Sequence, residues 1–173
     1  MRLGSRLRHT LFGRAMYGLQ KLAGTLVADK YLRIGHQPAL PSTIAQEFQG
    51  LLHTGDVLVV RKEYALTNYF LPGYWPHAAV FLGNTTALRQ LKGVNQEKLQ
   101  PHWARLDELT SGDNIVMESM RDGVRLRPLS SPFGSDSIVV IRPQLAPSDV
   151  SEALCRCLSH QGKPYDFNFD FSR

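Results

Sequence analysis

Short apolar runs, each bounded by residues typical of turns, recur along the chain after residue 55. Runs of this kind are typical of strands that lie in the interior of a sheet. The Asp122-Gly123 turn predicts that two of these runs are joined as a β-hairpin. The pattern therefore predicts strands at residues 57–60, 77–82, 114–119, 124–127 and 137–142, with one more extended piece at residues 165–169.

Helices are predicted between some of these strands but not between all of them. Ser42 is a candidate N-cap, because a serine hydroxyl can accept a hydrogen bond from the first helical turn. The predicted helices cover residues 43–52, 86–91, 104–109 and, beginning at Ser148 or Asp149, residues up to about 160. Because strands and helices do not alternate strictly, a doubly wound parallel sheet is not expected. The sequence predicts an α+β domain over residues 42–173, with an antiparallel sheet or partial barrel and packed helices.

The first 41 residues differ from the rest in both periodicity and charge. Leucine and alanine recur at three- and four-residue steps from Leu3 to Leu26, which predicts an amphipathic helix followed by a proline-containing linker. Residues 1–35 hold seven Lys or Arg against one Asp, or +6, so the remaining residues sum to −1 of the net +5. A basic helix of this kind is suited to an anionic membrane surface, or to packing on its own domain or on a partner.

Composition and charge exclude several classes of protein. The chain has 173 residues, 43% hydrophobic and 20% charged, which excludes a wholly disordered chain, a collagen and a long coiled coil. The sequence contains no apolar run of about 18 residues, so no transmembrane helix is predicted. Because the net positive charge lies before residue 36 and no nucleic-acid-binding motif is present, no nucleic-acid partner is expected. The two cysteines, Cys155 and Cys157, favour a reducing, cytoplasmic compartment, and the basic segment at residues 1–35 suggests peripheral contact with a membrane. Neither a metal nor a cofactor is expected.

His77 and Glu118 are the two residues whose positions suggest chemistry. His77 begins an apolar strand directly after an aromatic loop, where neighbours can set the tautomer of the ring. Glu118 ends the apolar run at 115–117, where a carboxylate is unfavourable unless it is paired. A carboxylate on a strand beside that of a histidine can accept the imidazole N–H and orient the ring. The alternatives are a histidine that merely caps its strand and an acid on an edge strand in water.

Several stretches resemble, in order, the motifs of permuted papain-like cysteine hydrolases of the NlpC/P60 superfamily, the YiiX/YebB-like proteins. They are the Gly-Asp strand at 55–60, the histidine strand at 75–83, the Glu-Ser and Gly-Val hairpin at 116–124 and the Gly-x-x-Tyr-Asp segment at 162–166. The resemblance implies a circularly permuted papain-like fold. It also implies an enzyme that hydrolyses or transfers at an amide, thioester or ester bond through an acyl-cysteine. In that chemistry His77 is the base and Glu118 orients it.

The resemblance also implies a cysteine nucleophile after the Tyr-Asp segment, and no cysteine follows Asp166 in this sequence. The explanations are a fragment, a truncated gene or a loss of catalysis; in the first two cases we expect a cysteine shortly after residue 173. Cys155 and Cys157 lie on a predicted helix and are expected to be small core side chains, so neither is assigned as the nucleophile. Whether the protein is an enzyme is therefore left open by the sequence.

Two functions follow from this reading. The first is a hydrolase or acyltransferase with a small-molecule, lipid or peptide acyl substrate. The second is an inactive binding module that keeps the papain-like cleft and uses residues 1–35 to dock on an anionic membrane or a partner. Tyr165 is a candidate oxyanion donor or a half-buried aromatic. Tyr74 and Trp75, with Tyr69, either line a substrate cleft or close the end of the sheet.

Overall fold

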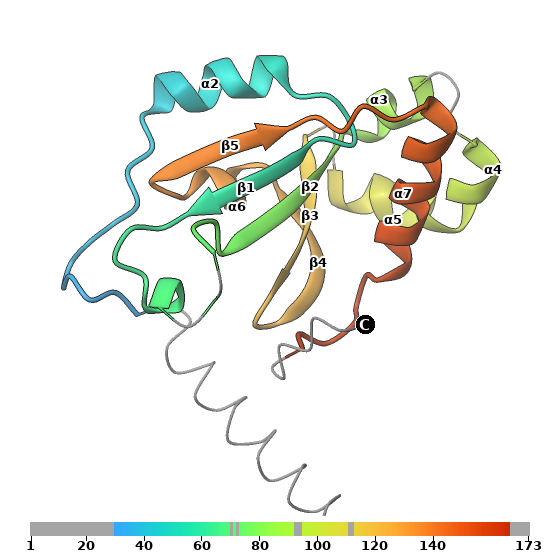
Figure 1. The fold of residues 1–173 in the computed structure, drawn as a ribbon. Helices are drawn as coiled ribbons and strands as arrows, with labels where there is room; N and C mark the ends of the chain where they lie inside the picture. The colour runs from blue at the N-terminus through green and yellow to red at the C-terminus, as the bar shows by residue number, and fades with distance from the viewer. Residues whose placement is uncertain (1–29, 70, 72, 92–94, 111–112, 167–173) are drawn as a thin grey trace, which may run out of the picture.

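The computed structural model describes residues 30–69, 71, 73–91, 95–110 and 113–166, which Figure 1 shows as a coloured ribbon. In these residues five strands form one open antiparallel sheet in the order β4-β3-β2-β1-β5. The strands are β1 (Val57–Arg61), β2 (His77–Gly83), β3 (Ile115–Met120), β4 (Gly123–Pro128) and β5 (Ser137–Ile141). The predicted α+β class and the five predicted strands are confirmed, and the sheet does not close into a barrel. Tyr165 and Asp166 form no strand, and the rest of that predicted piece lies outside the described residues.

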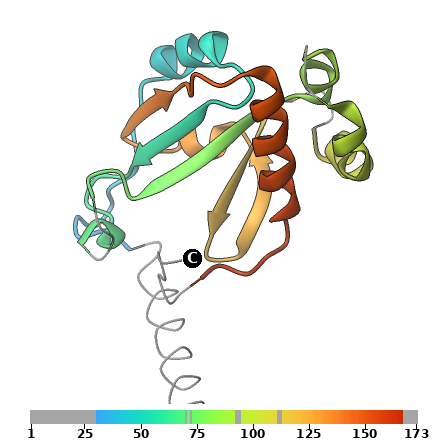
Figure 2. The same cartoon turned by 45° about the vertical axis from the view of Figure 1, so that its right-hand side comes forward.

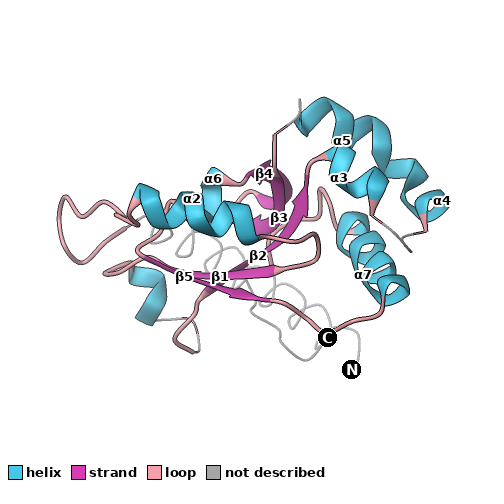
Figure 3. Cartoon of the chain, turned by 90° about the horizontal axis from the view of Figure 1, so that it is seen from above, coloured by secondary structure: helices cyan, strands magenta, loops and turns pink. Residues whose placement is uncertain are grey.

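Helices cover both faces of this sheet, as the view from above shows (Figure 3). The α-helices are α2 (Ser42–Leu51), α3 (Thr85–Gln90), α4 (Gln96–Leu99), α5 (Trp103–Thr110), α6 (Ser130–Phe133) and α7 (Pro147–Ser159). Two short 3₁₀ helices, η1 (Leu66–Tyr69) and η2 (Gln100–His102), complete the set in the described part of the chain. None of the described residues forms a helix that is both long and apolar enough to span a bilayer.

Two hydrophobic clusters, one on each face, explain why the strand sequences are apolar without clear alternation. Met117 packs in the cluster that contains α7, whereas the adjacent Val116 packs in the cluster that contains α6. Successive strand residues point to opposite faces, so a strand buried on both sides reads as a continuous apolar run. Figure 2 shows α7 lying across the face that carries Met117.

The predicted helices that fall in the described residues are confirmed in position, but two details differ. The N-cap of α2 is Pro41, without a side-chain hydrogen bond, and Ser42 is already helical, so the prediction of Ser42 as N-cap was wrong. The four-residue helices α4 and α6 were not predicted, because a single turn is too short to show a helical period. The predicted helix in residues 1–29 lies outside the described residues.

The described residues before α2, which include the predicted linker, lie against the domain. The amide of Leu66 donates to the carbonyl of Lys30, and the amide of Leu32 donates to that of Tyr64. His36 Nε2 lies 3.0 Å from Asp136 Oδ2, a carboxylate that also accepts the amides of Ala39 and Glu63. This stretch is therefore held on the domain by backbone hydrogen bonds and by the contacts of Asp136 with His36 and Ala39.

At the other end of the sheet, the aspartate of the Gly-Asp motif ties three elements together. Asp56 is 1% exposed, and Arg142, just after β5, donates to both of its carboxylate oxygens at 2.8 Å. Arg142 also donates to the carbonyl of Leu51 at the end of α2, and the amide of His53 donates to Asp56. Burial raises the pKa of Asp56, but the hydrogen bonds from Arg142 and His53 and the charge of Arg142 outweigh it and hold the pKa below its ordinary value. Asp56 is thus a structural residue.

After α7 the chain returns along the tip of the β3–β4 hairpin (Figure 2). The amide of Val124 donates to the carbonyl of Lys163, and the amide of Gly162 donates to that of Val124. Gly123 has φ +95°, and a Cβ at this position would overlap the carbonyl oxygen of Lys163. Only glycine therefore lets the Gly-x-x-Tyr-Asp segment approach the hairpin this closely.

We expect Gly123→Ala to lower the free energy of unfolding by roughly 1–3 kcal/mol more than Gly162→Ala. Gly162 also has a positive φ, +83°, but a Cβ there meets nothing within 4 Å, so it controls for backbone strain alone. Urea unfolding of both variants measures the difference. Equal destabilisation of the two variants would mean that the close approach of the Gly-x-x-Tyr-Asp segment to the β3–β4 hairpin does not contribute measurably to the free energy of unfolding.

Candidate active site

His77 and Glu118 lie on neighbouring strands and face the same side of the sheet. Ala79 of β2 pairs directly with Glu118 of β3, so His77, two residues earlier on the same face, is the diagonal neighbour of Glu118. His77 Nε2 lies 2.6 Å from Glu118 Oε2. The contact expected from the sequence between these two side chains is present, while their catalytic roles remain a prediction.

Two further residues hold the carboxylate of Glu118. The Ser131 hydroxyl of α6 donates a hydrogen bond to Oε1, and Arg127 Nε of β4 lies 3.3 Å from the same oxygen. Arg127 is within ion-pair distance but is not aligned as a hydrogen-bond donor, and its Nη2 binds Asp122. Sequence reasoning missed both residues, because a serine in a four-residue helix and an arginine on a strand carry no local signal.

Burial distinguishes the two members of the pair. The side chain of Glu118 is 1% exposed, whereas that of His77 is 29% exposed. A carboxylate this deep in an apolar setting requires hydrogen bonds and positive charge to stay ionised. The accessible end of the pair is therefore the imidazole.

The pKa of Glu118 lies below its ordinary value of 4.5. Burial acts to raise this pKa, but the hydrogen bonds from His77 and Ser131 and the charges of His77 and Arg127 lower it further than burial raises it. The group is ionised at neutral pH and has no proton to donate. The Nε2–H of His77 must then donate to Glu118, which leaves Nδ1 of the neutral ring as the proton acceptor.

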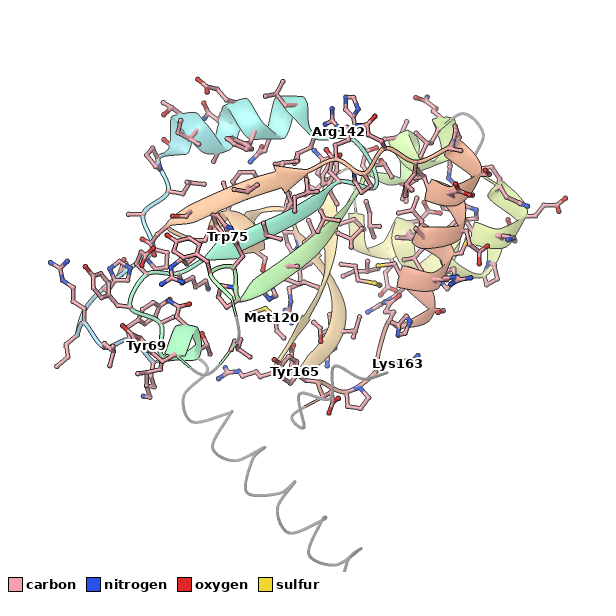
Figure 4. All side chains as sticks on the ribbon, viewed as in Figure 1. Tyr69, Trp75, Met120, Arg142, Lys163 and Tyr165 are labelled. Atoms are coloured by element: carbon pink, nitrogen blue, oxygen red, sulfur yellow. The ribbon has the colours of Figure 1, made fainter. Side chains whose placement is uncertain are left out.

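The aromatic residues before β2 are largely exposed. Tyr74 is 60% and Trp75 37% exposed, and their rings meet edge to face at 5.2 Å. Arg61 donates to the carbonyl of Tyr74 and lies 4.4 Å from the centroid of its ring. Trp75 precedes His77, the first residue of β2, by two residues, and Figure 4 labels it in this part of the molecule. Whether these rings line a substrate cleft or close the end of the sheet stays a prediction.

Tyr165 lies at the β3–β4 hairpin end, near the position of Met120 (Figure 4). It is half-buried, and burial, followed by the charge of Asp166, raises its pKa. The hydroxyl therefore stays protonated, as a hydrogen-bond donor requires. Its predicted role at the oxyanion position remains a prediction.

Neither cysteine is placed to attack at His77. Cys157 Sγ lies 3.2 Å from the sulfur of Met117, which points to the face opposite Glu118. Cys155 and Cys157 both pack against the cluster under α7. Burial raises the pKa of Cys157 to about 11 and is also the largest effect raising the pKa of Cys155. Both cysteines are partly buried and pack on the face of the sheet opposite the imidazole, which agrees with the expectation that neither is the nucleophile.

Comparison with known proteins gives one family. The model of the permuted papain-like amidase enzymes, the YaeF/YiiX or C92 family, matches residues 51–173. This stretch is well over half of the chain and contains His77 and Glu118. No curated protein and no solved structure matches the chain. Membership of the wider NlpC/P60 superfamily stays a prediction.

We expect Glu118→Gln to reduce the dependence of stability on acid pH. A carboxylate whose pKa is lower in the folded state than its ordinary 4.5 contributes stability above pH 4.5, and that contribution is lost as the pH falls through the folded-state value. Urea unfolding at pH 7 and at several values below pH 4.5 measures it. Glu118→Gln removes this loss, and the loss that remains belongs to other carboxylates.

Ser131→Ala is the matched second variant. It removes one hydrogen bond to Oε1, so the pKa of Glu118 moves up toward its ordinary value and the pH dependence becomes intermediate. An identical pH dependence in the natural protein and both variants would show that Glu118 does not titrate with folding.

Proposed function

The chain belongs to the YaeF/YiiX family of permuted papain-like amidases, and from this premise we propose that it acts on an acyl substrate through a cysteine nucleophile, with His77 as the base. Amide hydrolysis is the activity that the family name supports. The finer proposal is that His77 exchanges the proton, that Glu118 orients His77, and that thioesters and esters are also substrates. The 2.6 Å contact between Nε2 and a buried, ionised carboxylate is the observation that carries it.

In the proposed reaction His77 Nδ1 takes the proton of the attacking thiol. The thiolate adds to the substrate carbonyl carbon, and the charge of Glu118 stabilises the imidazolium. The imidazolium then returns the proton to the leaving amine nitrogen as the C–N bond breaks, which leaves a thioester. Water, deprotonated by the same Nδ1, attacks the thioester, and the thiolate leaves and is reprotonated.

The burial of Glu118 supports this assignment of roles. An orienting carboxylate has to remain charged and fixed while the histidine changes its protonation state. Glu118 is fixed by Ser131 and kept charged by its neighbours, whereas His77 is exposed enough to meet a substrate. The thiol that the reaction needs is neither Cys155 nor Cys157, which are the two cysteines of residues 1–173, so the proposal requires a cysteine outside these residues.

Three aromatic residues are proposed to contact the substrate. Tyr74 and Trp75 are exposed beside the start of β2 and offer flat apolar surfaces to an acyl group. Tyr165 carries a protonated hydroxyl, which suits a donor to the developing oxyanion.

The second candidate is a binding module that does not turn over its ligand. The observation that favours it is that both cysteines lie on the wrong face of the sheet. In that case His77 recognises an acyl ligand as a hydrogen-bond partner and Glu118 only orients the ring.

The experiment compares single variants of a protein form that contains the additional cysteine on fluorogenic N-acyl aminocoumarins of short and long acyl chain, and tests residues 1–173 alone beside it for binding without turnover. We expect His77→Ala to lower kcat/KM at least about a thousandfold and Glu118→Gln at least about a hundredfold, since base and orienter act as one unit. Cys155→Ser and Cys157→Ser are the matched controls and should change kcat/KM less than about threefold, because neither thiol meets the substrate.

Three other outcomes are informative. Loss of turnover in either cysteine variant would place the chemistry on the α7 face and contradict the proposal. Turnover that survives His77→Ala would also contradict it. Saturable binding of the same amides without turnover, weakened by His77→Ala, would support the binding module instead.

A further inference from the structure

Three loops meet at the end of the sheet where β1 ends and β2 begins. They comprise residues 30–36, residues 61–69 and residues 73–76, and together we call them the loop surface. Tyr31 forms a β-bridge with Ala65, and the amide of Leu32 donates to the carbonyl of Tyr64. Arg61 donates to the carbonyl of Tyr74 at 2.8 Å. These contacts bring segments that are distant in the sequence into one surface.

Large apolar side chains are concentrated on this surface. Six of the ten exposed large hydrophobic residues in the described part of the chain belong to it: Leu32, Ile34, Tyr64, Tyr69, Tyr74 and Trp75. Ile34, at the turn between Tyr31 and His36, is 99% exposed, and Leu32 is 56% exposed. Figure 4 labels Tyr69 and Trp75 in this region of the molecule. Clusters of exposed apolar side chains mark interaction sites.

Positive charge lies among these apolar side chains. The three loops contain Lys30, Arg33, Arg61 and Lys62, and the one acid in them, Glu63, is paired with Arg61. Asp136, which reaches the surface from the start of β5, is paired with His36. With His36 neutral, the four cations and two acids sum to +2. Arg33 lies 5.8 Å from the centroid of the Tyr64 ring, so charge and aromatic surface are directly adjacent.

We propose that the loop surface docks on an anionic lipid bilayer, with Leu32 and Ile34 inserted among the lipid headgroups. The surface of an anionic bilayer is bound by three kinds of side chain together. They are aliphatic side chains at an exposed turn, tyrosine and tryptophan around them, and cations between them. The buried centre of a protein–protein interface is also rich in aromatic residues, but it is poor in lysine. The charge complementarity therefore selects the lipid surface.

The loop surface lies at the sheet end that carries His77, the first residue of β2. Docking would bring this end of the molecule to the bilayer. The binding itself does not require His77, Glu118 or any turnover, so it stands independently of the proposed function.

The test uses the full chain and sedimentation with lipid vesicles. The vesicles are made of phosphatidylcholine alone or of phosphatidylcholine with phosphatidylglycerol, each at low and high salt. We expect retention only on the anionic vesicles, and less of it at high salt. The double variant L32D/I34D should weaken binding at least about tenfold, and Arg33→Glu at least about fivefold.

The matched control is the double variant L51D/L145D. Leu51 and Leu145 are 67% and 49% exposed and lie beyond the opposite end of the sheet, near Arg142, so this variant adds the same charge elsewhere. It should bind like the natural chain. Circular dichroism of each variant establishes that it is folded.

Several outcomes would overturn the proposal. If L32D/I34D binds as the natural chain does, or the control loses as much binding, the loop surface is not the docking site. Binding that is lost only when the basic residues of 1–29 are neutralised would assign docking to that segment alone. Equal binding to neutral vesicles, or none to either kind, would exclude the anionic bilayer as partner.

Discussion

The arrangement of this molecule depends on keeping one carboxylate charged while removing it from water. Glu118 is nearly inaccessible, and it stays ionised because His77, Ser131 and Arg127 surround it from β2, α6 and β4. Separating any of these elements would take one partner away from a buried charge, which is destabilising because the remaining partners must offset its loss of hydration. The same constraint that stabilises the packing of α6 on the sheet therefore also fixes the tautomer of the imidazole.

The sheet separates two regions with different chemistry. One face carries the His77–Glu118 pair beneath α6, and the other carries the cluster under α7 that includes both cysteines. A thiol becomes reactive when positive charge or a base lies close to it, and burial in apolar surroundings has the opposite effect. The raised pKa values of Cys155 and Cys157 match their role as packing groups. The presence of a cysteine in the sequence is therefore no guide to the nucleophile.

The two ends of the sheet also differ in how their segments are held. Where β1 begins, Asp56 and Arg142 lock α2, β1 and β5 together through a buried pair. Where β1 ends, the loops are held mainly by backbone hydrogen bonds and leave Ile34, Tyr69 and Tyr74 exposed. The end that carries His77 is therefore also the end where most of the exposed large apolar side chains of the described residues lie.

The sequence by itself determined the strands, most of the helices and the pairing of His77 with Glu118. Apolar runs and turn residues are local signals, and the odd placement of an acid after an apolar run is visible without coordinates. Only the tertiary structure decided that the sheet stays open, that Ser131 and Arg127 support Glu118, and that Cys157 faces away from His77. Each of these three features depends on the order of the strands and on the face of the sheet to which a side chain points. Contacts between segments that are distant in the sequence produce no periodic pattern of residues, so they cannot be predicted from it.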